Sequence, residues 1–181
     1  SAPVVAACAT CGSSLKHLYA ETFAAVGDRD YAEKAAALAE RVRDLSQLLV
    51  DGGVRRPERP LHLRVTFHDP CHLARGQGVT RQPRELLRAL PGVEFVEMRD
   101  ADRCCGGAGS FSFSHYELAK RINDRKMASI AATEAQVVAT ECPSCKLHLP
   151  DGLVRLGMPQ RARQVVELLA AAYGTTIAGR A

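Results

Sequence analysis

The sequence predicts an α/β fold with a largely parallel sheet, helices on its faces, and cysteine-containing loops at the carboxyl ends of the strands. Three segments, at 61–67, 93–98 and 136–140, have the apolar or alternating pattern of short strands, and helical patterns separate them. A group of cysteines follows each of these segments. Since the carboxyl ends of parallel strands share one edge of a sheet, the three loops can converge on one point.

The N-terminal segment has the same pattern as the third of these strands. Residues 3–7 have the pattern of a short buried strand and lead into Cys8-Ala-Thr-Cys11, just as the third strand leads into Cys142-Pro-Ser-Cys145. A strand that begins so abruptly suggests that a preceding segment has been removed. We therefore expect a duplicated module, in which residues 1–54 are the tail of a first copy with a connecting helix and residues 61–181 are a complete second copy.

Two helices are predicted between the N-terminal strand and the next one. Residues 15–23 have a helical pattern, and a longer helix begins at Asp30, which forms a capping-box pattern with Glu33. The apolar residues at helical spacing in the longer helix are Ala35, Leu38, Val42, Leu45 and Leu49. The pair Gly52-Gly53 ends this helix, and residues 55–60 form a linker.

The strand after the linker positions the first cysteine of the second copy. Apolar and polar residues alternate over 61–67, and the strand ends at His-Asp-Pro-Cys. Asp69 can cap a following turn of helix, and Pro70 suits its first position. We therefore expect Cys71 to lie near a helix N-terminus.

The remaining elements continue the alternation of strands and helices. Residues 81–90 form a predicted helix, and the strand at 93–98 follows it. Ser114 and Glu117 have the spacing of a capping box for the next helix. The apolar face of that helix consists of Leu118, Ile122, Met127 and Ile130. A last helix is predicted over 160–173.

The cysteines have the most informative spacing in the chain. Cys104 and Cys105 are adjacent and open the run Cys-Cys-Gly-Gly-Ala-Gly-Ser, and neighbouring cysteines rarely form a disulfide with each other. Together with Cys71, Cys142 and Cys145 they make five thiols in three groups. Thiolates are soft ligands that favour zinc, copper(I) and iron–sulfur clusters. The spacing therefore predicts a metal or iron–sulfur site.

Five thiols exceed the four that a structural zinc ion or a cubane cluster takes. The surplus fits a larger or opened cluster, or a site in which one thiol is kept for redox chemistry. Backbone N–H groups of Gly106, Gly107 and Gly109 can approach closely and donate hydrogen bonds to the sulfurs. The other candidates beside the ligands are His68, His72, Arg75, Lys126 and Lys146. Cys8 and Cys11 form a further Cys-x-x-Cys pair, which needs other ligands to bind a metal.

The composition disfavours several classes of function. The chain has 181 residues, of which 46% are hydrophobic and 24% charged, and its formal net charge is +4. Its basic residues are scattered, which disfavours binding to nucleic acid, and no apolar run is long enough to span a bilayer. The seven cysteines are odd in number and grouped as ligands. We therefore expect a reducing, cytoplasmic location, with any membrane contact made through a partner.

Four segments of the chain resemble the cysteine-rich CCG domain. They are His-Asp-Pro-Cys-His-Leu-Ala-Arg (68–75), Cys-Cys-Gly-Gly-Ala-Gly-Ser-Phe (104–111), Asn-Asp-Arg-Lys-Met (123–127) and Glu-Cys-Pro-Ser-Cys-Lys-Leu-His-Leu (141–149). The resemblance covers residues 61–173, and residues 3–50 resemble the end of a preceding copy and the helix that joins the two. The domain occurs in heterodisulfide reductase, in the iron–sulfur subunit of glycolate oxidase, in lactate-utilisation proteins and in anaerobic glycerol-3-phosphate dehydrogenase.

The resemblance implies that the chain is the C-terminal portion of a longer iron–sulfur oxidoreductase, in which a ferredoxin-like segment and a first CCG copy come earlier. By position, the ligands of a non-cubane 4Fe–4S cluster would be Cys71, Cys104, Cys105, Cys142 and Cys145. Such a cluster would reduce a disulfide or would relay electrons from a flavin-containing dehydrogenase subunit toward quinone. The sequence departs from the family at two points. The first copy contributes only Cys8 and Cys11, which cannot complete their own site, and Gln164 stands where many relatives have a histidine.

We therefore predict an electron-transfer iron–sulfur module of a multi-subunit oxidoreductase, of the glycolate or lactate dehydrogenase type or similar to heterodisulfide reductase. Ser-His-x-x-Leu-Ala-Lys at 114–120 is similar to the glycolate oxidase subunit and favours the first type. The sequence assigns no catalytic residue, so the chain would act as a subunit or fragment of the enzyme. Two alternatives stay open: a zinc-stabilised docking module that uses four of the five thiolates, and a thiol–disulfide centre in which Cys104 or Cys105 attacks a substrate disulfide.

Overall fold

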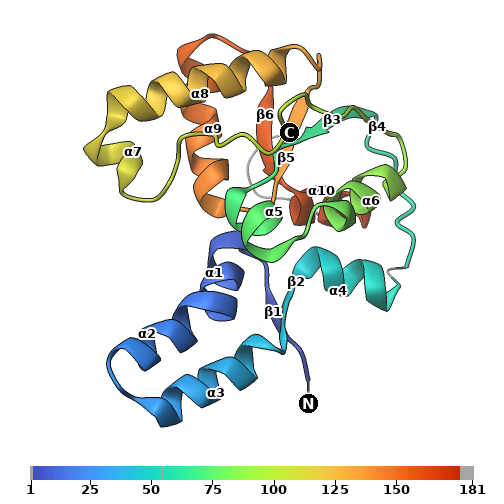
Figure 1. Ribbon diagram of the computed structural model, residues 1–181. Helices are drawn as coiled ribbons and strands as arrows, with labels where there is room; N and C mark the ends of the chain where they lie inside the picture. Colours follow the sequence, from blue (N-terminus) through green and yellow to red (C-terminus); the bar gives the residue numbers. More distant parts are fainter. Residues whose placement is uncertain (1, 54, 176–181) are drawn as a thin grey trace.

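The computed structural model describes residues 2–53 and 55–175, so the expected region boundaries at 54 and 181 lie outside the described residues. In the described part, one parallel sheet has the strand order β4 (Val93–Phe95), β3 (Leu63–Phe67), β5 (Val137–Thr140) and β6 (Arg161–Gln164). A smaller parallel pair consists of β1 (Val4–Ala6) and β2 (Val42–Asp44). Helices surround the larger sheet (Figure 1). The predicted α/β fold with a largely parallel sheet is confirmed.

The helices divide between two regions. Those of the N-terminal region, residues 2–53, are α1 (Ala9–Ser13), the π-helix η1 (Ser14–Leu18), α2 (Tyr19–Ala25), α3 (Arg29–Ala39) and α4 (Leu45–Gly52). Those of the C-terminal region, residues 55–175, are α5 (Cys71–Gln77), α6 (Arg81–Ala89), α7 (Phe111–Ser114), α8 (Tyr116–Ala131), α9 (Pro143–Arg155) and α10 (Val165–Ala172). None of these helices is long and apolar enough to cross a membrane.

Strand β3 lies inside the larger sheet, with β4 on one side and β5 on the other. Helices α5, α6 and α10 bury one face of the sheet, where Phe67 and Leu87 belong to the core, and α8 and α9 bury the other, where Met127 and Val138 do. The chain leaves β3 toward β4 in one direction and returns to β5 in the other. Such a reversal of strand order leaves a crevice at the carboxyl ends of the strands. The loops after β3 and β5 begin at that crevice.

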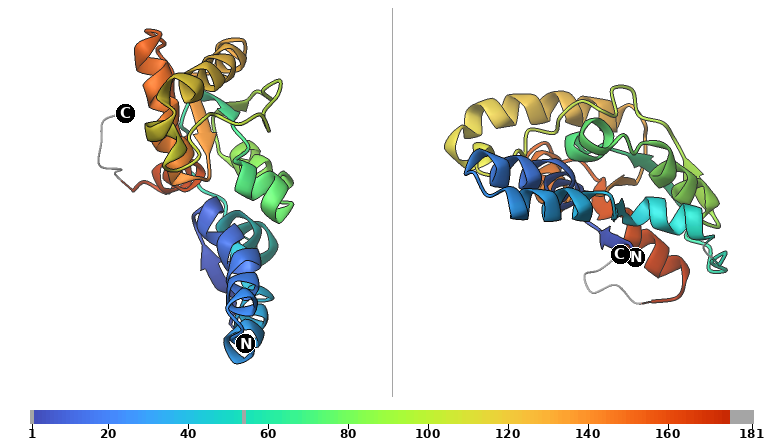
Figure 2. Two further views of the ribbon diagram at one scale, coloured as in Figure 1. Left: turned by 60° about the vertical axis from the view of Figure 1, so that its left-hand side comes forward. Right: turned by 60° about the horizontal axis from the view of Figure 1, so that its bottom comes forward.

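The N-terminal region is attached at the same edge of the sheet. The N–H of Ala9 donates to the carbonyl of Glu141 at 3.0 Å, and the side-chain amide of Gln77 donates to the carbonyl of Ala9 at 3.0 Å. A ring nitrogen of His17 donates to the carbonyl of Gly76 at 2.8 Å. Helices α2 and α3 form a hairpin that points away from the larger sheet (Figure 2). The first helices of the N-terminal region therefore contact α5 and the loop after β5.

The β1–β2 pair and the β5–β6 pair are built alike. In each, the first strand ends two residues before a Cys-x-x-Cys whose first cysteine is the N-cap of the next helix. The last paired residues are Ala6 with Asp44 in one pair and Thr140 with Gln164 in the other. Asp44 and Gln164 each form a reciprocal capping box at the start of the following helix. The two strand pairs thus have the same register at their carboxyl ends. In both, the helix after the first strand starts at a cysteine, and the helix after the second strand starts with a capping box.

The prediction of one continuous helix from Asp30 is wrong, because a strand interrupts it. Helix α3 ends at Ala39, and β2 comes before α4 begins. Val42 is fully buried and pairs with Val4 in β1. Pairing between strands overrides the helical spacing of the apolar residues, because intrinsic propensity is weak compared with tertiary packing.

Two predicted helix caps are also wrong. Asp28 rather than Asp30 caps α3, and its carboxylate accepts the N–H at the third helical position. Helix α8 has His115 at its N-cap, and the Ser114 hydroxyl donates to the carbonyl of Ser110 at 3.1 Å instead of capping. In both places the helix starts one or two residues away from the predicted position.

The last predicted helix starts later than expected. Residues 161–164 pair with β5 as strand β6, so α10 begins at Val165 rather than at 160. Helix α9, which starts directly after the third strand, was not predicted. The strand predicted at 93–98 ends at Phe95, where the chain leaves the sheet toward the paired cysteines.

Candidate metal centre

Cys71 is held at the carboxyl end of β3 by a buried ion pair. Pro70 is the N-cap of α5 and Cys71 is its first residue, so the cysteine lies at a helix N-terminus as predicted. The sequence predicts Asp69 as the cap, but Asp69 instead accepts two hydrogen bonds from Arg84, at 2.8 and 2.7 Å. Arg84 also donates to both oxygens of Glu97 at 2.8 Å. The Arg84 and Asp69 side chains are 14% and 4% exposed, and their pairing compensates for the burial of both charges.

The loop that carries Cys104 and Cys105 depends on a glycine. Gly106 has a φ of +91°, and its N–H donates to the Cys104 sulfur at 3.3 Å. A Cβ at this position would lie 2.5 Å from the carbonyl oxygen of Ala119, so a larger residue does not fit. The side-chain amide of Asn123 donates to the carbonyl of Cys105 at 3.0 Å. The positive φ of Gly106 and the bond from α8 together fix the direction of both thiols.

The last two cysteines lie where β5 turns into α9. Cys142 is the N-cap, and Pro143 occupies the first helical position, where a missing N–H costs nothing. Cys145 follows one turn later, so both sulfurs lie on the same side of the helix start. The unpaired N–H groups of a helix N-terminus favour negative charge, and this stabilises thiolates there.

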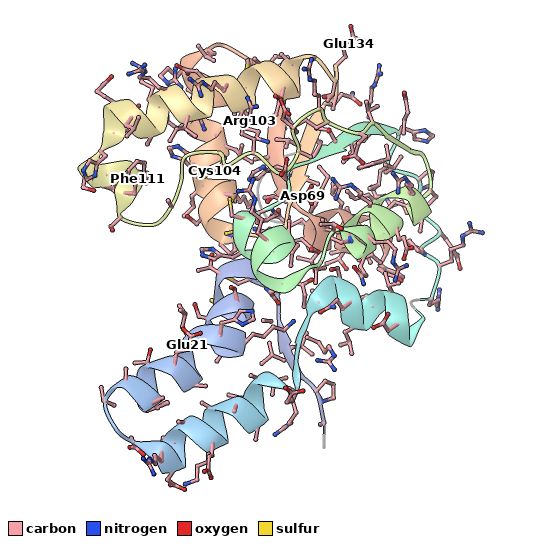
Figure 3. All side chains as sticks on the ribbon, viewed as in Figure 1. Glu21, Asp69, Arg103, Cys104, Phe111 and Glu134 are labelled. Atoms are coloured by element: carbon pink, nitrogen blue, oxygen red, sulfur yellow. The ribbon has the colours of Figure 1, made fainter. Side chains whose placement is uncertain are left out.

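The five sulfurs form one continuous row of contacts. The hydrogen-bonded thiol pairs are Cys71 with Cys104, Cys104 with Cys105, Cys105 with Cys145, and Cys145 with Cys142. The sulfurs of Cys105 and Cys145 and a ring nitrogen of His68 all lie within 4.8 Å of one another. Cys104 lies near α5 and the start of α9 (Figure 3). The loops after β3, β4 and β5 therefore converge, as the predicted sheet requires.

Hydrogen bonds within the row set its protonation pattern. Contacts with Cys105 and Cys71 lower the pKa of Cys104 to about 2, and a contact with Cys145 lowers the pKa of Cys142 to about 5. The bond to Cys104 raises the pKa of Cys105 to about 11 and also raises the pKa of Cys71. The bond to Cys105 raises the pKa of Cys145. Thiolates thus accept hydrogen bonds from the neighbouring thiols, and a soft metal would displace the remaining protons.

His68 and Lys126 are buried beside the row. His68 is completely buried, its ring nitrogens form no hydrogen bond of regular geometry with the described residues, and its ring interacts with the backbone of Ala101. Burial lowers the pKa of His68 to about 3, and the charge of Lys126 acts in the same direction, so the imidazole is neutral. The Lys126 ammonium donates to the carbonyls of Asp100 and Ala101 at 2.7 and 3.1 Å. Its charge also interacts favourably with Cys105.

The other predicted neighbours of the sulfurs differ in what they contact. The N–H of Gly107 donates to the Cys105 sulfur, as the glycine-rich run suggests. Arg75 lies one turn after Cys71 on α5 and forms an exposed ion pair with an aspartate, Asp102, at 3.2 Å. Lys146 forms an ion pair at 2.6 Å with the capping glutamate of α10. The structure therefore brings Gly107 to the sulfurs and directs Lys146 toward α10.

The N-terminal region also reaches the centre. The hydroxyl of Thr10 lies 3.1 Å from Nδ1 of His72 and 3.5 Å from the Cys142 sulfur. Cys8 interacts electrostatically with Cys142, and its sulfur accepts the N–H of Cys11 at 3.4 Å. Cys11 is exposed. The sequence signal for Thr10 is its place inside the first Cys-x-x-Cys, and this signal was missed.

Two further residues shape the loop of the paired cysteines. His148 on α9 lies against Gly106 and Gly107, since a Cβ on either glycine would come within 3.2 or 3.3 Å of its side chain. Asn123 holds the carbonyl of Cys105, and it opens the Asn-Asp-Arg-Lys-Met segment, which was noticed for its resemblance alone. Both side chains belong to helices that pack on one face of the sheet.

The donor set fits a soft metal or a cluster. It combines thiols in mutual contact, backbone N–H groups directed at two of the sulfurs, and a buried imidazole whose nitrogens form no regular hydrogen bond with the described residues. Thiolate and imidazole ligands select zinc, copper and iron–sulfur centres over magnesium or calcium. Orphaned buried nitrogens are rare in folded proteins and call for an explanation such as a missing ion.

Comparison with known families matches residues 65–150 to the cysteine-rich domain designated CCG. This segment belongs to the CCG family. The matched segment contains β4, β5 and most of β3 and α9, and all five converging cysteines fall within it. The family resemblance expected from the sequence is therefore confirmed.

The similarity of the chain to known proteins extends beyond the CCG domain and into the N-terminal region. The chain is 36% identical over 171 residues to a subunit of the fumarate reductase (CoM/CoB) of Methanothermobacter marburgensis, which covers 94% of this chain and 32% of that protein. It is 36% identical over 151 residues to the probable glycolate oxidase iron–sulfur subunit of Bacillus subtilis, covering 81% and 34%. It is 37% identical over 120 residues to a subunit of the dihydromethanophenazine:CoB–CoM heterodisulfide reductase of Methanosarcina barkeri, covering 65% and 29%. The chain thus spans about a third of the length of these curated relatives.

Proposed function

We propose that this chain holds an iron–sulfur cluster and transfers electrons as part of a multi-subunit oxidoreductase. The observation that carries the proposal is the contact of five cysteine sulfurs from three loops of one sheet edge. The names of the relatives add support, because they describe an iron–sulfur subunit of glycolate oxidase and subunits of two reductases. An iron–sulfur cluster takes up and releases single electrons, which is the chemistry this function needs.

The proposed ligands of the cluster are Cys71, Cys104, Cys105, Cys142 and Cys145. Since a cubane cluster takes four cysteines, the fifth thiol supports a non-cubane 4Fe–4S type. The chain's own groups would balance the negative charge of the thiolates. The N–H groups of Gly106 and Gly107 donate to sulfurs, and the buried Lys126 ammonium is attracted to one of the thiolates.

The organisation of the parent protein is part of the proposal. Residues 1–54 would be the tail of a first CCG copy, and residues 61–181 the second copy. The shared register and the two capping boxes of the strand pairs support this duplication. A ferredoxin-like segment and the rest of the first copy would complete the protein, which accords with the small share of each relative that the chain covers.

The proposed partner is a flavin-containing dehydrogenase subunit, and the proposed substrate class is a 2-hydroxy acid such as glycolate or lactate. The likeness to the glycolate oxidase subunit supports this choice, and the likeness to a heterodisulfide reductase subunit supports disulfide reduction as the alternative. The chain would serve as an electron carrier in either complex. A reducing, cytoplasmic location belongs to the proposal, because free thiols persist there.

One observation favours a second candidate, a zinc-stabilised docking module. Two cysteine sulfurs and one imidazole nitrogen within 4.8 Å of one another are the donor types that structural zinc takes. Zinc would need a fourth ligand from the row and would leave one thiol unused. The two candidates differ in iron content, in colour and in the number of cysteines that they require.

The test is anaerobic purification of the chain followed by measurement of iron, acid-labile sulfide and zinc. The proposal expects several irons with matching sulfide, lost from Cys105→Ser and retained in Cys11→Ser, which changes an exposed thiol outside the row. One zinc and no iron, even after anaerobic reconstitution with iron and sulfide, would contradict electron transfer by this chain. That result would favour the docking module.

A further inference from the structure

His68 is the least explained polar side chain in the described part of the molecule. It is completely buried at the carboxyl end of β3, three residues before the first cysteine of the row. Nδ1 and Nε2 form no hydrogen bond of regular geometry with the described residues, and the backbone of Ala101 is the one group among them that interacts with the ring as a hydrogen-bond partner. Leaving a buried polar atom unpaired costs about 1–3 kcal/mol, so a fold rarely keeps such a ring nitrogen without a reason.

The ring has two sulfurs beside it. One nitrogen of His68 and the sulfurs of Cys105 and Cys145 lie within 4.8 Å of one another. A single metal ion with bonds of about 2.0 Å to nitrogen and about 2.3 Å to sulfur holds such donors about 3.5–4 Å apart. The three donor atoms, all within 4.8 Å of one another, lie close to that separation. The spacing of the three atoms is therefore compatible with ligands of one metal ion.

The ring has oxygen atoms beside it as well: the backbone of Ala101 interacts with it as a hydrogen-bond partner, and two buried threonines share its face of the sheet. His68 follows Phe67, which pairs with Ala139, so His68 lies beside Thr140 on the neighbouring strand. Thr140 and Thr66 share the sheet face of His68, are completely buried, and have hydroxyl groups without partners among the described residues. A histidine that binds a metal through one nitrogen usually donates its other N–H to such an oxygen or to an ordered water.

We propose that His68 is a nitrogen ligand of the metal centre in this domain, which makes the donor set five cysteines and one histidine. The inference rests on the proposed function, because it names one more ligand at the same centre. Cys105 and Cys145 share the metal with the imidazole, and the carbonyl of Ala101, or a hydroxyl of Thr140 or Thr66, accepts the remaining N–H. Among cluster proteins, histidine in place of cysteine raises the reduction potential. His68 thus gives this centre a higher potential than thiolates alone.

The test uses the anaerobically purified chain, labelled with ¹⁵N-histidine, and pulsed EPR of its reduced cluster. A ligating His68 gives a nitrogen coupling comparable to that of the histidine ligands in Rieske centres, and it changes with the isotope. The coupling should vanish in His68→Gln and remain in His62→Gln, which alters an exposed histidine. In His68→Cys, the cluster should form without the nitrogen coupling and with a lower reduction potential.

The outcomes separate the inference from the proposed function. A cluster without nitrogen coupling in the unsubstituted chain, or with coupling that survives in His68→Gln, overturns the ligand assignment while the cluster stands. A chain that takes up zinc instead of iron refutes the electron-transfer function, and the zinc absorption edge then tests His68. One nitrogen neighbour lost in His68→Gln supports it, and an all-sulfur shell overturns it. If His68→Gln does not fold, His68→Cys provides the same comparison, and a chain that binds neither metal overturns both statements.

Discussion

The two Cys-x-x-Cys motifs of this chain follow strands of the same design but end in different surroundings. In both, the first cysteine caps a helix, and the strand pairs have the same register at their carboxyl ends. Cys142 is buried and belongs to the row of five sulfurs, whereas Cys11 is exposed. The loops after β3 and β4 supply the other three thiols, and in the described residues the N-terminal pair has β2 alone beside its strand. A Cys-x-x-Cys therefore supplies two donors, and a metal site forms where the loops after neighbouring strands supply the remaining donors.

The strongest test of this difference between the two cysteine pairs is to substitute each pair in turn. We expect Cys142→Ser/Cys145→Ser to lower the bound iron at least about tenfold, because soft metals hold hydroxyl groups poorly. The matched variant Cys8→Ser/Cys11→Ser should keep its iron, because its sulfurs lie outside the row. Metal analysis after anaerobic purification measures both. Equal loss from the two variants would show that the N-terminal pair is also part of the centre.

A glycine substitution in each region tests how tightly the cysteine loops are packed. Gly106→Ala places a Cβ against backbone at a φ of +91°, and we expect a loss of about 2–5 kcal/mol of stability together with the metal. Gly12→Ala meets the end of the flexible Gln77 side chain and should cost less than about 1 kcal/mol. Urea unfolding of each variant gives the difference in stability.

The control for the loop itself is Gly109→Ala. Gly109 also has a positive φ, +57°, but a Cβ there would meet open space. Only backbone strain remains, and it should cost about 1 kcal/mol. If Gly106→Ala were as mild as Gly109→Ala, the contact with Ala119 would not be what fixes the paired cysteines.

The sequence predicted the sheet and the cysteine loops but failed at the same place in both regions. The missed strands are β2 and β6, and each runs into the next helix with no loop between them. Val42 and Leu45 fit helical spacing, and Arg161 to Gln164 looks like the first turn of the helix that follows. Parallel pairing with β1 and β5 decides both cases. Such pairing joins residues far apart in the chain, so local patterns do not contain it.

The candidate site could be predicted from the sequence to a similar extent. The grouping of cysteines after three strands is a local pattern combined with a rule about parallel sheets, and it led to the correct edge. The partners of charged residues were not accessible in this way. Asp69 has the sequence position of a helix cap, yet it pairs with Arg84 fifteen residues later, and Lys146 pairs with Glu167 rather than with the sulfurs.

The comparison extends to the buried carboxylates of the two regions. Asp69 follows β3 and has Arg84 as its partner, so Arg84→Met should leave a buried charge unpaired and cost about 3–5 kcal/mol. Arg88→Met is the matched control, because Arg88 is more than half exposed and lies 3.8 Å from Glu97. We expect that control to cost less than about 1 kcal/mol. Adding Asp69→Asn to Arg84→Met should recover part of the loss in thermal unfolding, and no recovery would mean that packing rather than charge is lost.

Asp44, at the end of β2, has no such cation in hydrogen-bond contact among the described residues. Its carboxylate accepts the N–H and hydroxyl of Ser46 at 2.9 and 2.6 Å, and the Glu141 carboxyl from the C-terminal region donates to it. Burial raises the pKa of Asp44 and raises the pKa of Glu141 well above its usual value. The two regions therefore meet at a carboxyl pair that binds protons more tightly when folded than when unfolded.

A folded state that holds protons more tightly loses stability as the pH rises above the ordinary carboxyl pKa of about 4. The contribution of this pair is therefore fully present below about pH 4 and declines as the pH rises through the raised values. Asp44→Asn keeps the oxygen that accepts from Ser46 and removes one charge, so its stability should decline less between about pH 4 and pH 8. At neutral pH it should exceed the unsubstituted chain by about 1 kcal/mol. Asp51→Asn, an exposed change on α4, should follow the original pH profile in urea unfolding. If Asp44→Asn and Asp51→Asn had the same profile, the contact between the two regions would not depend on the proton held by this pair.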